Sequence, residues 1–144
     1  SPLADILEIV LAEVRQAGIA DGQMDIVIAG GMHPPIREDQ ARAKLGPAAR
    51  HIPWRMNPWG DRCRYVEVGR AGAVRVLIDG GVAQADLRIL IASVSPHLQA
   101  GFGGGYKMFF PGCGELASIR ALHRTGIGGA GSANSQLAIV IRRL

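Results

Sequence analysis

The 144-residue sequence predicts an α/β fold with an open, mostly parallel sheet and flanking helices. A helical pattern at the start of the chain leads into an apolar strand that ends in glycines, which is typical of open α/β sheets. A second apolar strand, residues 87–92, also ends in a turn, which contains proline and histidine. The length suits one domain, so we expect residues 1–144 to form a single, Rossmann-like unit that includes a hairpin.

The individual helices and strands are predicted from the spacing of apolar residues and from the glycines and prolines that end each segment. Apolar residues at i, i+3, i+4 and i+7 between Leu3 and Val14 predict an amphipathic helix that begins near Pro2 and ends near Gly18. Residues 24–29 then predict a buried strand, and the prolines that follow it predict a loop. The remaining expected elements are a helix over residues 37–45, a hairpin of strands 65–68 and 74–78, a helix over 115–124, a flexible loop over 126–136 and a last strand over 137–141.

Composition narrows the classes of function. A net charge of +4 and a pI near 9.7 are compatible with nucleic-acid binding, but the basic residues are scattered along the chain. The one dense group, Arg62, Arg64 and Arg70, is better read as the exposed face of a strand. We therefore expect no nucleic-acid partner.

Hydropathy and cysteine usage indicate a location. No apolar run reaches the length of a membrane-spanning helix, and the opening residues lack the basic leader of a secretory signal. Cys63 and Cys113 lie far apart and form no CxxC pair, so a disulfide framework is not expected. A reduced, cytoplasmic setting without membrane contact fits these features.

Chemistry-bearing residues cluster near predicted strand and helix ends. His33 and His97 each lie just beyond an apolar strand, at the sheet edge where open α/β folds bind ligands. Lys107 lies in the densest glycine segment, and His123 lies near the end of a predicted helix. Each histidine taken alone can equally be an ordinary surface or core residue, and that is our reading of His51.

The glycine segment, residues 101–108, suggests an anion-binding loop because glycines let backbone N–H groups approach a phosphate. It is not a Walker loop, since Met108 stands where a Ser or Thr is required. It also lacks the third glycine of a dinucleotide fingerprint. Gly103, Gly104 and Gly105 remain candidates either for holding a phosphate or for turning the backbone.

These residues together resemble the lactate racemase family. The run HLQAGFGGGYK from His97 to Lys107, followed by Phe110-Pro111-Gly112 and then His123, matches that family's pattern of Pro-His, Ala-Gly-Phe, Gly-Gly, Lys, Pro-Gly and a later His. Upstream, GMHPP at residues 31–35 resembles its Gly-x-His-x-Pro motif. The resemblance covers residues 3–125.

The resemblance implies a 2-hydroxy-acid racemase or epimerase that uses a nickel pincer nucleotide, a pyridinium mononucleotide whose ring carbon and two sulfurs hold nickel. It implies that Lys107 bears this cofactor through a thioamide and that His123 is the fourth nickel ligand. It also implies that His33 and His97 are acid/base groups on opposite faces of the substrate, while hydride transfer inverts the carbon. Gly103, Gly104 and Gly105 would receive the nucleotide phosphate.

Physical chemistry supports these roles independently. Imidazole titrates near pH 6.5, so it can act as a base in one direction and an acid in the other. Imidazole also suits nickel. A lysine is nucleophilic only when neutral, and the aromatic neighbours of Lys107 would favour the neutral amine by desolvation, unless those aromatics are plain core.

Some features depart from the family. Members are longer and have a second domain that closes over the cofactor, so a missing second domain or a partner chain is expected here. The family's early Asp-x-x-Arg segment has no match, and Pro34 and Tyr106 stand where basic residues are usual. Two alternatives follow: a non-catalytic module of the same ancestry that binds an anion or a partner, and a zinc-dependent hydrolase whose metal is held by His33, His97 and His123.

Overall fold

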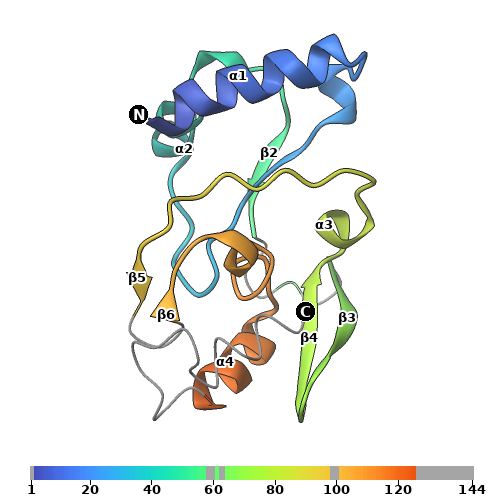
Figure 1. The fold of residues 1–144 in the computed structure, drawn as a ribbon, viewed down its shortest axis with the longest axis vertical. Coiled ribbons are helices and arrows are strands. Elements are labelled where there is room, and N and C mark those ends of the chain that lie inside the picture. The colour runs from blue at the N-terminus through green and yellow to red at the C-terminus, as the bar shows by residue number, and fades with distance from the viewer. Residues whose placement is uncertain (1, 58–60, 62–63, 98–100, 126–144) are drawn as a thin grey trace. The chain divides into compact units, whose positions relative to one another are not determined.

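The computed structural model describes residues 2–57, 61, 64–97 and 101–125, and they form a mixed α/β structure (Figure 1). By the contacts between its residues, the chain divides into two compact units. Unit 1 comprises Ser1–Ile28 and Pro34–Met56, and unit 2 comprises Ala29–His33 and Asn57–Leu144. The two units are described separately.

Unit 1 holds the parallel strand pair and two helices. Strand β1 (Ile26–Ile28) pairs in parallel with β2 (Trp54–Met56), with Ile26 opposite Trp54. Helix α1 (Pro2–Gln16) buries Leu7 and Leu11 of its apolar stripe, and α2 (Glu38–Leu45) buries Ala41 and Leu45. The predicted first helix, first strand and second helix are therefore confirmed, with the strand shorter than expected.

Close packing between the end of α2 and the start of α1 depends on a glycine. Gly46 ends α2 with φ +76°, and a Cβ at this position would lie 2.8 Å from the Cβ of Ala4. At the other end of α1, Arg15 donates to Asp21, with Nε and Oδ1 2.7 Å apart. Asp21 begins a short 3₁₀ helix, Asp21–Gln23, which leads into β1.

Unit 2 is built around a hairpin and a helix. Strands β3 (Tyr65–Ala71) and β4 (Val74–Asp79) are antiparallel, and α4 (Leu116–Thr125) packs against β4. A short helix, α3 (Gly80–Gln84), follows β4 and is capped by the Asp79 carboxylate, which accepts from the N–H of Val82. The buried core consists of Val76, Ile78, Phe110, Ile119 and Leu122.

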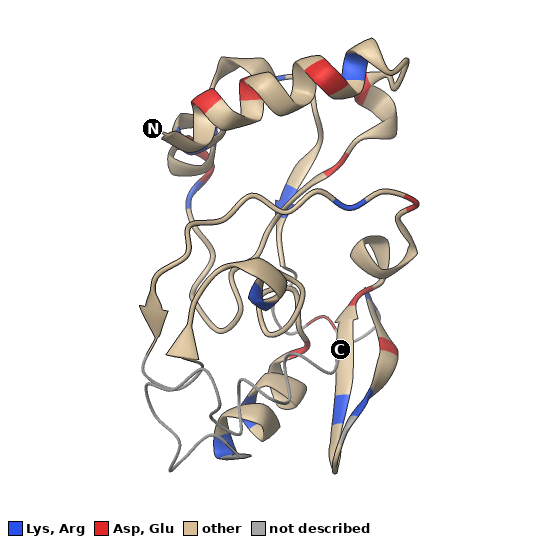
Figure 2. Cartoon of the chain, in the orientation of Figure 1, with Lys and Arg blue, Asp and Glu red and all other residues tan. Residues whose placement is uncertain are grey.

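Charge on the hairpin is balanced locally. Figure 2 shows acidic and basic residues together on β3 and β4, and Glu67 accepts hydrogen bonds from both Arg70 and Arg75. Of the three arginines expected on an exposed strand face, Arg70 lies on β3 and is exposed, Arg64 precedes the strand, and Arg62 lies outside the described residues. The hairpin and the helix over residues 115–124 are likewise confirmed.

Two further segments of unit 2 carry the candidate site. Strand β5 (Pro96–His97) pairs with β6 (Gly101–Phe102) in an antiparallel arrangement, so that His97 is opposite Gly101. A 3₁₀ helix, Gly105–Met108, follows, and the chain then turns through the cis Phe110–Pro111 bond towards α4.

The predicted α/β class, with parallel pairing and flanking helices, is confirmed, but the strand expected at residues 87–92 is wrong. That segment has no strand assignment, and most of its side chains are exposed. A strand needs a neighbour to receive its backbone hydrogen bonds, and no described segment pairs with it. The expected loop at 126–136 and strand at 137–141 lie outside the described residues. No helix in the described ranges is long and apolar enough to cross a membrane.

Candidate functional site

Lys107 lies in the 3₁₀ helix Gly105–Met108 of unit 2, with its side chain half-buried. Its N–H donates to the carbonyl of Gly104 at 3.2 Å, and its carbonyl accepts from Gly112 at 2.8 Å, so both flanks of the residue are fixed. Burial lowers the pKa of the Lys107 amine from its usual value. Desolvation penalises the charged ammonium, and the neutral amine is the nucleophilic form.

His97 and His123 share the electrostatic environment of this lysine. His97 is in β5 and His123 is in the last turn of α4, and both imidazoles are half-buried. Burial lowers the pKa of His97, and the positive charges of Lys107 and His123 lower it further. Burial and the charge of Lys107 likewise lower the pKa of His123. Because such charge effects fade with distance, these three side chains lie in one neighbourhood, and their functional roles stay predictions.

His33 reaches the same loop region through its backbone. It is exposed, and its N–H donates to the carbonyl of Gly30 at 2.9 Å in a tight turn. The N–H of Gly31, in the same turn, donates to the carbonyl of Gly112 at 2.8 Å, and Gly112 in turn donates to Lys107. The turn that bears His33 is thus attached to the loop that follows Lys107, and the role of its imidazole stays a prediction.

Gly112 is essential to that attachment. A Cβ at this position would lie 2.8 Å from the carbonyl oxygen of Lys107 and 2.9 Å from the Cβ of Ala29. Real Cβ atoms almost never come this close to backbone oxygens, so any larger residue would separate the two turns. Steric contacts therefore explain why the Pro-Gly motif has glycine at its second position, Gly112.

The three candidate phosphate-binding glycines differ from one another. Gly103 donates its N–H to the carbonyl of Ser95 at 2.7 Å, and Gly104 has φ +78° with its α-carbon packed against the Ser93 carbonyl. Only Gly104 is sterically required, because a Cβ there would overlap the Ser93 carbonyl oxygen, whereas a Cβ at Gly103 would lie 3.4 Å from Ser95 Oγ, an ordinary contact. Gly105, with φ +55°, has open space where a Cβ would be. Their role towards a phosphate stays a prediction.

Sequence reasoning missed a buried polar network that supports this region. Asn57, only 4% exposed, donates through Nδ2 to the carbonyl of Gly114 at 2.9 Å and accepts from the Tyr65 hydroxyl at 3.1 Å. Burial, together with the negative charges of Asp79 and Glu115, raises the pKa of Tyr65 to about 12. No local pattern marks these residues, because their partners are distant in sequence.

The start of α4 is fixed by a second buried carboxylate. Glu115 Oε2 accepts from both the backbone N–H and the hydroxyl of Ser118, at 2.8 and 3.1 Å. Its own N–H donates to the carbonyl of Leu77 in β4, and the N–H of Asp79 donates to Cys113. These bonds hold the chain between Lys107 and His123 against the hairpin.

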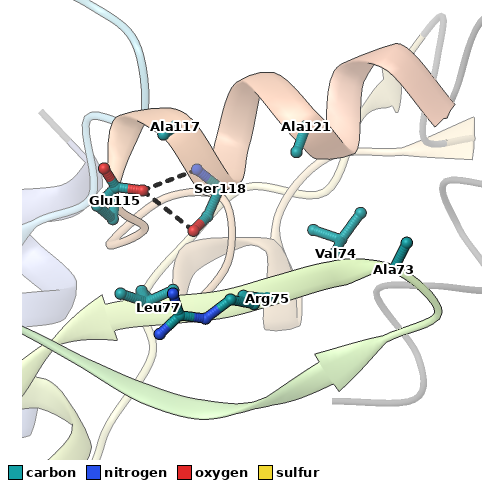
Figure 3. Close-up of a pocket in the computed structure, with 8 residues that line it drawn as sticks. All are labelled: Ala73, Val74, Arg75, Leu77, Glu115, Ala117, Ser118 and Ala121. Carbon is teal, nitrogen blue, oxygen red and sulfur yellow. Dashed lines mark hydrogen bonds between the residues drawn. The ribbon is translucent and has the colours of Figure 1, made fainter.

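A groove between β4 and α4 does not include the predicted site residues. It is lined by the residues shown in Figure 3, which are Ala73, Val74, Arg75, Leu77, Glu115, Ala117, Ser118 and Ala121. Its two charged residues are already engaged, Glu115 by Ser118 and Arg75 by Glu67. The groove therefore offers no group for the chemistry that the sequence suggests.

The zinc alternative is wrong for the residues that the structure describes. Among them, no three His, Cys, Asp or Glu side chains are grouped so that they could hold a metal ion. His33, His97 and His123 all belong to the described part of the chain, and their imidazoles do not converge as a three-ligand zinc site requires.

Comparison with known proteins agrees with this picture. The structure resembles that of the lactate racemase apoprotein from Thermoanaerobacterium thermosaccharolyticum, with a TM-score of 0.88 and 22% identity. The match covers 99% of this chain and 36% of that one. A protein from Thermotoga maritima, solved by a structural genomics consortium, matches with a TM-score of 0.68 and 19% identity over 83% of this chain and 34% of its own. At these identities the likeness shows the fold.

Sequence comparison gives the family. No curated protein sequence matches the chain significantly. The family model described as the lactate racemase N-terminal domain, however, matches residues 1–135, which is nearly the whole sequence. The chain, which spans about a third of the solved racemase, therefore belongs to the lactate racemase family through that family's N-terminal domain.

Proposed function

We propose that this chain is the cofactor-bearing part of a 2-hydroxy-acid racemase or epimerase. The observation that carries the proposal is the neighbourhood of His97, Lys107 and His123, in which burial and mutual charge keep an amine and two imidazoles towards their neutral forms. Membership of the lactate racemase family supplies the reaction class. Neutral nitrogen bases are what covalent attachment, metal ligation and proton removal require.

The residues present fit a nickel pincer nucleotide. Lys107 offers a partly desolvated amine, the form that can enter a thioamide link, and His123 offers a neutral imidazole, a suitable nickel ligand. No described carboxylate forms an ion pair with Lys107, so its amine is not held as an ammonium by a counter-ion. Such a cofactor, when bound, would accept and return the hydride of the substrate's α-carbon.

The remaining chemistry is proton transfer at the substrate hydroxyl. We assign it to His33 and His97, because each inversion requires one imidazole to accept the hydroxyl proton of the starting enantiomer and the other to donate a proton to the oxygen of the product enantiomer. The lowered pKa of His97 means that it is neutral and ready to accept a proton at neutral pH. His33 is held on a turn anchored through Gly31 and Gly112, which fixes its backbone relative to the Lys107 loop.

Attachment of the cofactor can be tested by intact mass. Lys107 and Lys44 are the two lysines of the chain, so Lys44→Arg is a matched control for Lys107→Arg. When the protein is made together with cofactor-synthesis enzymes, we expect a nucleotide-sized adduct that maps to Lys107 in the wild type and in Lys44→Arg. Its absence from both, or its persistence in Lys107→Arg, would contradict the proposal.

The second candidate is a non-catalytic module of the same ancestry that binds an anion or a partner. The exposed apolar segment at residues 87–94 favours partner binding. Racemisation of a 2-hydroxy acid by the cofactor-loaded chain, followed by chiral chromatography, would exclude this candidate. A cytoplasmic location and the lack of a nucleic-acid partner remain predictions from the sequence.

A further inference from the structure

One face of the β5–β6 pair carries polar side chains from β5 alone. His97 lies opposite Gly101, and the N–H of Gly103 donates to the carbonyl of Ser95 at 2.7 Å, which continues the same register beyond the two short strands (Figure 1). Side chains alternate between the faces of a strand, so Ser95 and His97 project to the same face. Because the residue opposite each of them is glycine, β6 and the residue after it place no side chain over either one.

The Ser95 hydroxyl lies where a side chain from the opposite strand would otherwise stand. A Cβ added at Gly103 would lie 3.4 Å from Ser95 Oγ, so the hydroxyl is on the side of the strand pair that this glycine leaves bare. Ser95 is exposed, and its hydroxyl makes no hydrogen bond with another residue in the described part of the chain. The hydroxyl is therefore available to a ligand that binds over the glycines.

The same face belongs to the candidate site through His97. The imidazole of His97 is half-buried, and the positive charges of Lys107 and His123 act on it. Ser95 precedes His97 by two positions, which in an extended strand places their α-carbons about 6.5 Å apart. A small molecule in contact with the His97 imidazole is thus within reach of the Ser95 hydroxyl.

The chemistry of a 2-hydroxy acid matches these two side chains. Its hydroxyl and its carboxylate are on adjacent carbons, so one small molecule presents both polar groups within a short span. A serine hydroxyl can donate to a carboxylate, and such a bond to a charged acceptor is stronger than a bond between neutral groups. The proposed function assigns the Lys107 amine to the cofactor, so the substrate carboxylate needs another donor at this face.

We propose that Ser95 is a substrate-binding residue whose hydroxyl donates a hydrogen bond to the carboxylate of the 2-hydroxy acid while His97 contacts the substrate hydroxyl. The proposal rests on the proposed function, from which it takes the substrate class. Two contacts at neighbouring groups of the substrate fix the orientation of its α-carbon relative to the strand. The bare backbone at Gly101 and Gly103 leaves room for the substrate beside both side chains.

An NMR titration of this chain with sodium lactate, read at the imidazole signals of His97, tests the proposal. Ser95→Ala should raise the dissociation constant of lactate about tenfold, because it removes one hydrogen bond to a charged acceptor. Ser95→Thr keeps a hydroxyl at the same position and should restore most of the affinity. Ser93→Ala is the matched control, because Ser93 is also exposed and lies two positions farther from His97, and it should bind lactate like the wild type.

Several outcomes would overturn the assignment of Ser95. They are equal lactate affinity in the wild type and Ser95→Ala, an equal loss in Ser93→Ala, and the absence of any lactate-dependent change at His97 in the wild type. A smaller nucleotide adduct on Lys107 in Ser95→Ala, with unchanged lactate affinity, would assign the hydroxyl to the cofactor phosphate and also overturn it. Absence of the adduct from the wild type, with lactate binding that depends on Ser95, would contradict only the proposed function.

Discussion

Removing the Asn57 side chain tests whether the buried network holds the loop between Lys107 and α4. Asn57→Ala deletes two hydrogen bonds at once, to the Gly114 carbonyl at 2.9 Å and from the Tyr65 hydroxyl at 3.1 Å. A neutral hydrogen bond contributes about 0.5–1.5 kcal/mol, and a buried polar group left without its partner costs about 1–3 kcal/mol. Because Asn57 is 4% exposed and Gly114 is buried, we expect a loss of about 2–4 kcal/mol.

The assay is urea denaturation followed by far-UV circular dichroism. Tyr65→Phe should cost about 1–2 kcal/mol, since it removes one of the two bonds and leaves Asn57 Oδ1 without that donor. The double variant should lose less than the sum of the two single losses, by about 1 kcal/mol, because both remove the same Tyr65–Asn57 bond. Gln84→Ala, at an exposed amide in α3, should change stability by less than about 0.5 kcal/mol. A loss below about 0.5 kcal/mol for Asn57→Ala, or strict additivity of the pair, would refute the reasoning.

Three further results are expected. Gly112→Ala should destabilise the chain by about 2 kcal/mol or more, because its Cβ would overlap neighbouring atoms. Gly69→Ala is the control and should be nearly neutral, because a Cβ there meets nothing within 4 Å. Equal losses of stability for the two variants in thermal unfolding would contradict the steric argument. In an absorbance titration, the difference between wild type and Tyr65→Phe should have a midpoint at about pH 12. Since an unfolded tyrosine ionises near pH 10, the stability that Tyr65 contributes is complete below about pH 10 and is lost as the pH rises towards 12. Lys107→Met should raise the pKa of His97 in NMR titrations, because it removes a nearby positive charge, and an unchanged midpoint would show that the two groups do not interact.

Local sequence patterns were sufficient to predict the helices and strands whose stabilising contacts lie within or next to their own segment. The stripe that buries Leu7 and Leu11 was visible in the spacing of α1, and the hairpin was visible because its strands are neighbours in sequence. The strand prediction for residues 87–92 was wrong because a strand also depends on contacts outside its own segment. Their composition describes the environment of a buried strand, but pairing depends on residues elsewhere, and none of the described residues provides it.

The same distinction applies to the candidate site. The motif resemblance singled out His97, Lys107 and His123 as candidates, and the charge of Lys107 contributes to the lowered pKa values of both histidines. It could not identify Asn57 or Tyr65, because a buried amide is defined by partners such as Gly114, 57 positions away. The reason for the glycine of the Pro-Gly motif was also hidden, since it is a steric contact with the distant Ala29.

The contact at Gly112 has a mechanical consequence. The backbone of this one residue accepts a hydrogen bond from Gly31, in the turn of His33, through its carbonyl and donates one to the carbonyl of Lys107 through its N–H, each at 2.8 Å. Two loops that are more than 70 positions apart in the chain are thereby joined through the backbone of a single residue. We therefore expect a spectroscopic label on the His33 turn to respond to substitutions in the lysine loop.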